Sequence, residues 1–296
     1  MLEKDIYKVD RMEVLKPFDP WRSKLCTCPS KLSLNPYTGC EHACVYCYAS
    51  SYIPDFFRCR PKKNLLPALK RDAKKLRGEL ISISNSSDPY PSLEEKLKLT
   101  RKCLEILSKA NCKIQIITKS TLVTRDMDIL KRMRAMVALT ITSLNDELSK
   151  KLEPKAPLAS ERIKAVEKLI KNKIPVAVRI DPIIPSLNDE QAELIKALAS
   201  LGVKHITSST YKVRKDNWQR FSLAFPRIAE KLKPLYFEKG EKIGRSYYLP
   251  RELRFRLMEK IKAEVEKHGM RFACCREGFP ELNSAVCDGS WLLSKV

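Results

Sequence analysis

Long apolar runs, glycine and acidic residues are all scarce in this chain of 296 residues. No run of about 18 apolar residues occurs, so we expect no membrane-spanning helix. The opening residues, MLEKDIYKVDRMEV, lack the apolar core of a secretory signal, and we therefore expect a cytoplasmic protein. Only eight glycines are present, and there is no fixed-period repeat. With 44% hydrophobic and 31% charged residues, the chain can bury a sizeable core and is not a disordered polyelectrolyte.

The shortage of acidic residues leaves the chain strongly basic. It has 57 Lys and Arg against 35 Asp and Glu, a net charge of +22. A heat-adapted surface would also be rich in charge, but such surfaces pair both signs. The excess therefore favours a polyanionic partner such as nucleic acid, DNA or RNA.

The basic residues are concentrated in two regions. Nine basic residues and one acid lie between Arg58 and Arg77. Near the C-terminus, cations are interleaved with aromatic residues, which favours either a nucleic-acid surface or a solvated face above core aromatics. These residues are Arg214, Lys215, Arg220, Arg251, Arg254 and Arg256 with Trp218, Phe221, Tyr247, Tyr248 and Phe255.

Strand-like and helix-like segments alternate between residues 32 and about 212, which is typical of a parallel βα sheet or barrel. The predicted strands are Leu32–Asn35, Leu80–Ser84, Lys113–Thr118, Val137–Thr142, Pro175–Ile180 and His205–Thr210. Several carry polar residues at alternate positions, which predicts a sheet curled around a polar cavity. We predict an α/β fold, an incomplete parallel (β/α)6 barrel over residues 32–212. We expect an N-terminal extension (1–31) before it and a basic, cysteine-containing, α-rich subdomain (213–296) appended after it.

The residues that directly follow these strands are candidates for a binding site. Ligands of βα folds gather where the parallel strands end. The alternative for each residue is an ordinary solvated loop position. The candidates are Ser86, Asp88, Lys119, Ser143, Asp181 and Lys212.

The strongest motif is NPYTGCEHACVYCYA, residues 35–49, in which Cys40, Cys44 and Cys47 form a CxxxCxxC pattern. Three thiolates can hold a four-iron cube and leave one iron without a protein ligand. An open iron can bind and polarise a small molecule, whereas a structural zinc site is closed by four protein ligands. The count of three therefore favours catalysis. Zinc completed by His42 is the alternative, but that ring sits between two ligands where geometry is cramped.

Over roughly residues 32–212 the sequence resembles the radical S-adenosylmethionine (SAM) enzymes. The Cys-x-Tyr-Cys-Tyr ending of the loop makes it similar to their spore photoproduct lyase-like branch. The resemblance implies that Cys40, Cys44 and Cys47 hold a [4Fe–4S] cluster whose fourth iron binds SAM. One electron, from a donor such as ferredoxin or flavodoxin, then cleaves SAM and releases a 5′-deoxyadenosyl radical. Such a radical requires a site that excludes water and positions one substrate hydrogen.

The same resemblance implies roles for further residues. Tyr46 and Tyr48 match family tyrosines beside the last cysteine, where a phenol can hydrogen-bond SAM or relay a hydrogen atom; ordinary packing is the alternative. Lys119 matches a lysine that pairs with the SAM carboxylate, and Arg179 could meet that carboxylate or a substrate phosphate. The cofactor-binding candidates are Ser84, Asn85, Ser86, Asp88, Lys119, Ser143 and Arg179.

One position departs from the photoproduct lyases. They carry a hydrogen-donating cysteine three residues before the aspartate that corresponds to Asp88, where this chain has Asn85. An amide cannot donate a hydrogen atom as a thiol does, so repair of thymine lesions by that route is not expected to carry over.

Five further cysteines lie near the two ends of the chain: Cys26, Cys28, Cys274, Cys275 and Cys287. Because chain ends often pack together, they could form a second site, either an auxiliary iron–sulfur cluster or a zinc site. A disulfide and unlinked buried thiols are the alternatives. Adjacent Cys274 and Cys275 point apart in an extended segment, so we expect only one of them to ligate.

We therefore expect a radical SAM enzyme that acts on a nucleic acid, by DNA lesion reversal or RNA nucleoside modification. One rival is a radical SAM enzyme that acts on a protein or a small metabolite. The other is a non-catalytic, metal-stabilised nucleic-acid-binding protein.

Overall fold

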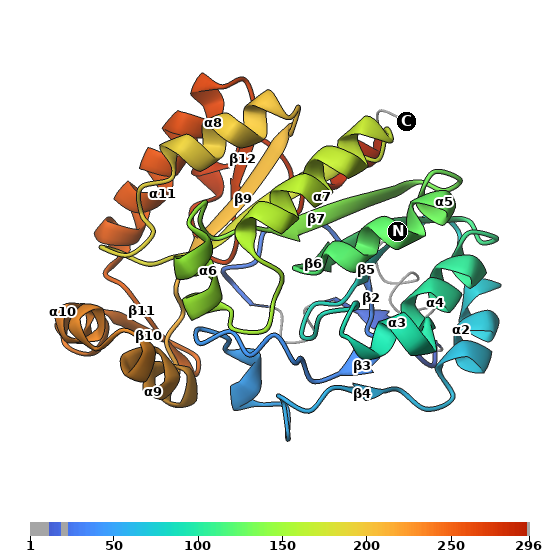
Figure 1. The fold of residues 1–296 in the computed structure, drawn as a ribbon, viewed down its shortest axis with the longest axis horizontal. Coiled ribbons are helices and arrows are strands. Elements are labelled where there is room, and N and C mark those ends of the chain that lie inside the picture. Colours follow the sequence, from blue (N-terminus) through green and yellow to red (C-terminus); the bar gives the residue numbers. More distant parts are fainter. Residues whose placement is uncertain (1–11, 19–22, 295–296) are drawn as a thin grey trace.

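The computed structural model describes residues 12–18 and 23–294, and its main element is an eight-stranded sheet (Figure 1). The strand order is β1-β2-β5-β6-β7-β8-β9-β12, so β1 and β12 form two open edges and the barrel is not closed. All neighbouring strands are parallel except β1, which is antiparallel to β2. The strands are β1 (Lys16–Pro17), β2 (Leu32–Leu34), β5 (Glu79–Ile83), β6 (Cys112–Thr118), β7 (Ala135–Thr140), β8 (Val176–Ile183), β9 (His205–Thr210) and β12 (Arg271–Cys274).

Helices cover the outer face of this sheet and bury its apolar residues. These outer helices are α2 (Leu65–Ala73), α4 (Leu99–Leu107), α5 (Met127–Leu130), α7 (Ala159–Lys171), α8 (Ala192–Ser200) and α11 (Arg251–Lys267). The remaining helices are α3 (Leu93–Leu97), α6 (Asp146–Leu152), α9 (Lys215–Ala224) and α10 (Pro226–Phe237). Small two-stranded sheets pair β3 (Tyr37–Thr38) with β4 (Arg60–Pro61) and β10 (Glu241–Ile243) with β11 (Ser246–Tyr248). In the described residues, no helix combines the length and the apolar character needed to cross a membrane.

The two faces of the sheet differ in polarity, as the alternating pattern predicts. Ile81 and Ile83 of β5 belong to the outer core, whereas Ser82 between them hydrogen-bonds Gln115 of β6 at 3.2 Å. Because successive residues of a strand point to opposite faces, the polar residues share the inner face. The inner face is therefore built to surround polar groups, and the predicted polar cavity is confirmed.

All six predicted strands are present, so the predicted partial parallel barrel is confirmed. The chain does not leave the sheet after β9, however. Helix α11 and strand β12 continue the alternation, and β12 pairs in parallel with β9, from Arg271 opposite His205 to Cys274 opposite Ser208. Sequence analysis did not identify β12, because four residues flanked by Gly269 and a cysteine pair give little periodicity. The division at residue 212 stays a prediction.

The last described residues fill the inner face of the sheet. The 3₁₀ turn η4 (Ser290–Ser294) packs Leu292 and Leu293 against residues of β7 and β8. Just before it, Asp288 forms a buried ion pair of 2.6 Å with Lys31. The backbone carbonyl of Asp288 also accepts a hydrogen bond of 2.6 Å from the Gln115 amide. The tail thereby closes the floor of the barrel and leaves space at the carboxyl ends of the strands.

His205 links this tail to β9 through a buried hydrogen-bond chain. The Trp291 indole N–H donates to His205 Nδ1 at 3.1 Å, so the ring proton is on Nε2, which donates to Thr207 Oγ1 at 3.1 Å. The Thr207 hydroxyl in turn donates to the backbone carbonyl of Cys287 at 2.9 Å. Burial lowers the pKa of His205 from 6.5 to about 4, because the charged ring is poorly solvated there.

We predict that acidification destabilises the fold through His205. The folded-state pKa lies below the unfolded value, so the stabilising contribution is complete above pH 6.5 and is lost as the pH falls towards 4. At pH 5 the loss is about 2 kcal/mol. Thermal unfolding of His205→Gln should show a smaller fall in Tm between pH 7.5 and pH 5 than the natural protein. The control His268→Gln, on a half-buried ring beside Glu264, should retain the full fall. An unchanged pH slope in His205→Gln would contradict this assignment.

Candidate active site

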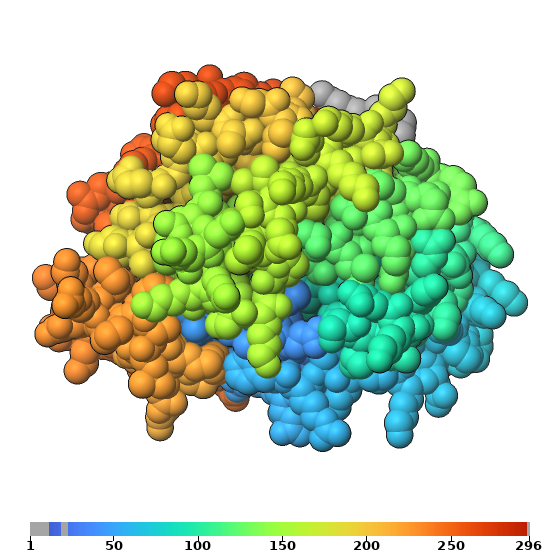
Figure 2. All heavy atoms as spheres, viewed as in Figure 1, coloured from blue at the N-terminus to red at the C-terminus, as the bar shows by residue number. Residues whose placement is uncertain are grey.

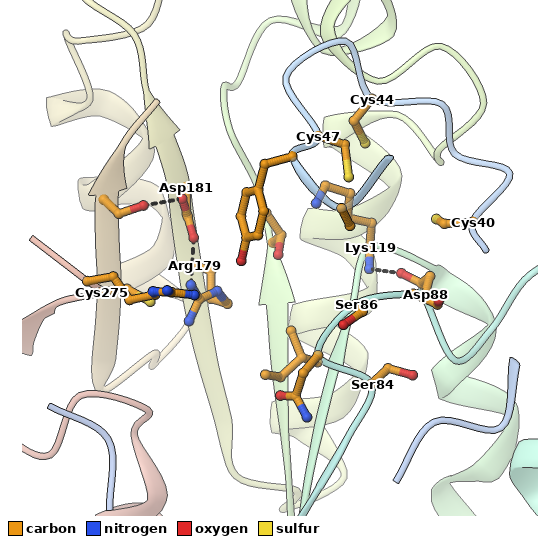
Figure 3. Close-up of a pocket in the computed structure, with 18 of the residues that line it drawn as sticks. Cys40, Cys44, Cys47, Ser84, Ser86, Asp88, Lys119, Arg179, Asp181 and Cys275 are labelled. Carbon is orange, nitrogen blue, oxygen red and sulfur yellow. Dashed lines mark hydrogen bonds and ion pairs between the residues drawn. The ribbon is translucent and has the colours of Figure 1, made fainter. Parts of the chain in front are cut away.

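A cavity of about 460 Å³ lies at the carboxyl ends of the parallel strands. Figure 3 shows Cys40, Cys44 and Cys47 on one side of it and Arg179, Asp181 and Cys275 on the other. The charged residues lining it include six Lys and Arg and three Asp, namely Lys16, Lys31, Lys119, Arg179, Lys212 and Arg276 with Asp88, Asp181 and Asp288. The cavity therefore has a thiol side and an excess of positive charge.

The cysteine loop is held by backbone contacts at both ends. Gly39, just before Cys40, has a φ of +80°, and a Cβ there would lie 2.5 Å from the carbonyl oxygen of Phe56. Only glycine fits this position. The next amide, that of Cys40, donates to the same carbonyl at 2.7 Å. At the other end, the Arg220 guanidinium of α9 donates to the carbonyl of Cys47 at 3.0 Å. These contacts fix the direction in which the loop presents its thiols.

The three thiols are free and largely buried. Burial raises the pKa of each above its ordinary value, to about 12 for Cys44. Without a metal they are therefore protonated at neutral pH, and binding of iron must release these protons. Three soft donors that face one end of a cavity fit a [4Fe–4S] cluster with one open iron, with space beside it for a small molecule.

His42 lies inside the loop but is directed at a carboxylate. Its Nε2 is 3.1 Å from Asp88 Oδ2, and Nδ1 is 3.4 Å from the carbonyl oxygen of Lys155. Burial opposes the charged ring, yet the Asp88 carboxylate outweighs it and raises the pKa of His42. With both nitrogens engaged, His42 is not placed as the fourth ligand of a zinc site.

Asp88 organises the ends of two strands. Burial would raise its pKa, but His42, the Thr118 hydroxyl at 2.7 Å and the Lys119 amide at 2.8 Å hold that pKa at about 2. Asp88 also accepts from the amide of Tyr90 at 2.9 Å. The residue lines the cavity as expected, and its carboxylate is bound to protein groups.

The segment from Ser84 to Ser86 lies at the cavity as predicted. Ser84 adopts a φ of +65°, and its buried hydroxyl has no hydrogen-bond partner among the described residues. The Asn85 side chain is bound to neighbouring strand residues: its amide nitrogen donates to Ser33 Oγ at 2.8 Å, and its oxygen accepts from Ser82 Oγ at 2.9 Å. The Ser86 hydroxyl lies 3.5 Å from that of Tyr52. The unpaired Ser84 hydroxyl marks a place where a polar ligand group would be satisfied.

Glu153 is a central residue that the sequence did not reveal. It is fully buried just after α6 and binds both the Arg162 guanidinium and the Tyr46 hydroxyl, while Lys119 Nζ lies 3.9 Å away. Burial would raise the pKa of Glu153, but Arg162 and Lys119 keep it below its ordinary value. The neighbouring Leu152 carbonyl accepts from the amide of Val45 at 2.9 Å, inside the cysteine loop. Glu153 therefore ties the loop to α6 and α7.

Tyr46 and Tyr48 differ in their surroundings. Tyr46 is buried with its hydroxyl on Glu153, so part of its role is structural. Tyr48 is half-buried at the cavity, with the Arg214 guanidinium 5.6 Å from its ring centre and 5.5 Å from that of Tyr52. This group of two phenol rings and one cation lies where the cavity meets α9.

The structure places Ser143 away from the other predicted site residues. Ser143 is not among the described residues that line the main cavity, and instead borders a second one with Asn145 and Asn188. Its Oγ accepts from the amide of Asn145 at 3.0 Å. The strand β7 ends at Thr140, and this residue lines the main cavity where Ser143 was expected. The strand ends two residues earlier than the sequence predicts, which places Ser143 outside the main cavity.

The wall opposite the cysteine loop is formed by charged residues of β8 and β9. Arg179 binds Asp181 at 2.5 Å, and Asp181 accepts from the Ser209 hydroxyl. Behind them Lys212 binds the buried Glu277 at 3.0 Å. Burial opposes the charge of Arg179, but Cys275 and Asp181 raise its pKa well above the ordinary value. Arg179 is thus a fixed cation facing the cavity.

Several C-terminal residues interpreted as a nucleic-acid surface are part of the core instead. Arg254 is buried and binds Glu277 at 3.2 Å and Glu241 at 2.9 Å. Phe221 and Tyr248 are buried as well. For Phe221 and Tyr248 the alternative of core aromatics is correct, because α9, α10 and α11 enclose a second apolar cluster. Buried Arg254 fits neither the nucleic-acid surface nor the solvated face. Arg214 and Lys215 remain at least partly accessible.

The remaining cysteines fall into two groups. Cys28 lies 3.9 Å from Cys287, sulfur to sulfur, and Cys26 and Cys275 lie beside this pair. Cys274 instead belongs to the outer core, as expected for an adjacent strand residue. As they stand, the described residues include no group of three or more His, Cys, Asp or Glu side chains that could hold a metal ion. A single ion at the second group of cysteines therefore requires some of their side chains to rotate.

Comparisons with known proteins identify the fold and the family. The model of the radical SAM superfamily matches residues 34–199. An uncharacterized protein of Methanocaldococcus jannaschii is 34% identical over 195 residues, which cover 62% of this chain and 70% of that protein. An uncharacterized protein of Mycobacterium tuberculosis is 23% identical over 263 residues, or 81% of this chain and 75% of that protein.

Two solved structures share the fold. Spore photoproduct lyase complexed with dinucleoside spore photoproduct superimposes with a TM-score of 0.64 at 15% identity, over 88% of this chain and 77% of that chain. A radical SAM methyltransferase from Sphaerobacter thermophilus gives a TM-score of 0.53 at 17% identity, over 88% of this chain and 67% of that chain. At these identities the likeness concerns the fold.

We predict that Glu153→Gln strongly destabilises the protein. The change leaves Arg162 buried without a counter-charge, which costs about 3–5 kcal/mol. The control Glu167→Gln removes an exposed pair with Lys171 on α7 and should cost less than about 1 kcal/mol. Urea unfolding measures both. Equal, small losses in the two variants would show that Glu153 does not anchor the loop.

Proposed function

This chain belongs to the radical SAM superfamily and is an enzyme of that superfamily, and we propose that it acts on a nucleic acid. The family implies a [4Fe–4S] cluster and SAM as cofactors. In the proposal, Cys40, Cys44 and Cys47 hold the cluster, and a further metal is bound by cysteines outside the loop. The enzyme works in the cytoplasm, where a ferredoxin or flavodoxin supplies the electron.

The cofactors, when bound, supply a carbon radical able to abstract a hydrogen atom from the substrate. The residues of the chain position the reactants and exclude water. Lys119 is suited to bind the SAM carboxylate, because its ammonium group lies near the thiol side of the cavity. Among the described residues, that ammonium group forms one ion pair, a long one of 3.9 Å with Glu153. The unpaired hydroxyl of Ser84 provides a further hydrogen bond at the same end of the cavity.

The observation that carries the nucleic-acid proposal is the charge of the cavity. Six cations and three carboxylates line it, with Arg179 fixed on the wall opposite the thiols. A substrate that spans the two walls would present a reactive group to the thiol side and a phosphate to Arg179. Tyr48, Tyr52 and Arg214 supply stacking surfaces beside the cavity for an unpaired base.

The charge of the remaining surface is consistent with this substrate class. Lys62, Lys63, Lys70 and Lys74 are exposed on the segment around β4 and α2. Figure 2 shows this light-blue segment on the same lower side of the molecule as the orange helices α9 and α10. Exposed cations on both sides of the loop region can follow a phosphate backbone.

The reaction differs from that of the photoproduct lyases at the position of Asn85. The Asn85 amide is engaged by Ser33 and Ser82, and it cannot return a hydrogen atom to a substrate radical. The proposal therefore covers DNA lesion reversal by another hydrogen donor and RNA nucleoside modification.

We predict that replacing Cys40, Cys44 or Cys47 by Ala abolishes SAM cleavage. Anaerobic reconstitution with iron, sulfide, dithionite and SAM should give about four irons per chain in the natural protein, and 5′-deoxyadenosine. Each variant should lose the cluster absorbance and at least 100-fold in product. Cys112→Ala, at the opposite end of β6, should keep both. Product formation by the loop variants would disprove the ligand assignment.

We predict salt-dependent binding of single-stranded DNA or tRNA. Arg214→Gln should weaken the affinity about tenfold. It should also reduce the slope of log Kd against log salt by about 1, the value expected for the loss of one phosphate contact. Lys171→Gln, on the outer helix α7, should leave both unchanged. Fluorescence anisotropy between 50 and 300 mM salt measures these values. If neither nucleic acid binds while SAM is still cleaved, the substrate is a protein or a small metabolite.

A further inference from the structure

Four cysteines from the two ends of the chain meet beside the cavity. Cys26 and Cys28 precede β2, whereas Cys275 follows β12 and Cys287 lies in the tail that fills the barrel. The sulfurs of Cys28 and Cys287 are 3.9 Å apart, with Cys26 beside Cys28 and Cys275 beside Cys287. The four sulfurs thus form a row, Cys26–Cys28–Cys287–Cys275.

Cys274 is separated from this row although it adjoins Cys275. It is the last residue of β12 and faces the outer core with Met258 and Phe272. The Cys287 thiol meets the carbonyl oxygen of Cys274 at 3.3 Å rather than its sulfur. Of the adjacent pair, of which the sequence led us to expect a single ligand, Cys275 is therefore the candidate.

The sulfur spacing favours one metal ion over a cluster or a disulfide. In a tetrahedral zinc site with bonds of about 2.3 Å, neighbouring sulfurs are about 3.8 Å apart. The distance between Cys28 and Cys287 is 3.9 Å. A disulfide requires about 2.05 Å. A four-iron cube holds its cysteine sulfurs farther apart than a single ion does, because each sulfur binds a different corner.

The surroundings of the four sulfurs suit bound thiolates. The Lys31 ammonium interacts with Cys28 and Cys287, and the Arg179 guanidinium interacts with Cys275 and Cys28. Lys31 also binds Asp288, and Arg179 also binds Asp181. The two cations therefore reduce, but do not cancel, the electrostatic repulsion between neighbouring thiolates. Cys28 and Cys287 already lie at ligand spacing, while the outer members Cys26 and Cys275 are only partly buried and have room to rotate.

We propose that Cys26, Cys28, Cys275 and Cys287 bind one tetrahedral zinc ion. The ion ties the segment before β2 to the end of β12 and to the tail. It also fixes Cys275 and thereby the position of Arg179 in the cavity wall. The site does not depend on the nature of the substrate, and its test does not use enzyme activity.

The test uses the full chain with Cys40, Cys44 and Cys47 replaced by Ser, so that iron at the loop does not interfere. Mass spectrometry of the purified protein should find about one zinc per chain. Adding Cys28→Ser or Cys287→Ser should lower zinc at least fivefold. Adding Cys274→Ser, the matched control, should leave it unchanged. Zinc that is absent, or that falls equally in the Cys274→Ser protein, would overturn the proposal.

A second measurement covers the case in which the Cys28 and Cys287 variants do not fold. The protein with only Cys40, Cys44 and Cys47 replaced by Ser, freed of metal and kept reduced, should bind one Co²⁺ with the thiolate charge-transfer and visible d–d absorption of tetrahedral Cys₄ coordination. Zinc should displace the cobalt. Reconstitution of the natural protein with iron and sulfide to about eight irons per chain would show a second cluster instead. Loss of two thiols in titration of the denatured, unreduced protein would show a disulfide, and either result would contradict the proposal.

Discussion

The structure depends on keeping charged groups satisfied inside a curled parallel sheet. Its inner face is polar, and a buried charge without a partner costs several kcal/mol. Buried carboxylates around the cavity are accordingly paired, as shown by Glu153 with Arg162 and by Asp288 with Lys31. The Lys31–Asp288 pair joins the two ends of the chain, and the Glu153–Arg162 pair joins the end of α6 to α7. The same interactions that make a polar interior tolerable also fix the relative positions of the cysteine loop, the strands and the tail.

The cysteine loop illustrates how this constraint positions the chemistry. Residues outside the loop hold it in place. The Leu152 carbonyl accepts a hydrogen bond from the Val45 amide, Asp88 pairs with His42, and Arg220 donates to the carbonyl of Cys47. These partners come from two different βα units and from α9. A loop anchored in this way can present three thiols with little conformational freedom, which reduces the entropy lost when they bind a cluster.

Sequence reasoning succeeded where the signal was local and failed where it was not. The CxxxCxxC motif and the apolar strands are patterns of residues close together in the sequence, so the loop and six strands could be predicted. Glu153 lies in an ordinary-looking stretch, KLEPK, and only folding brings it to Tyr46 and Arg162. Arg254 follows the pattern of a surface cation, yet its charge is neutralised by Glu277 in the core. Contacts between side chains that are far apart in the sequence produce no periodic pattern of residues, so a single sequence does not reveal them.

Helix α9 connects the proposed substrate surface to the cysteine loop. Arg214, immediately before the helix, covers the rings of Tyr48 and Tyr52, and Arg220 within it holds Cys47 and the hydroxyl of Ser50 at 2.7 Å. One helix and the residue before it thus contact both the tyrosine rings at the cavity and the carbonyl of Cys47. In the proposed function, a substrate lying on the rings of Tyr48 and Tyr52 is therefore next to the cysteine loop, where its bulk helps to exclude water from the cavity.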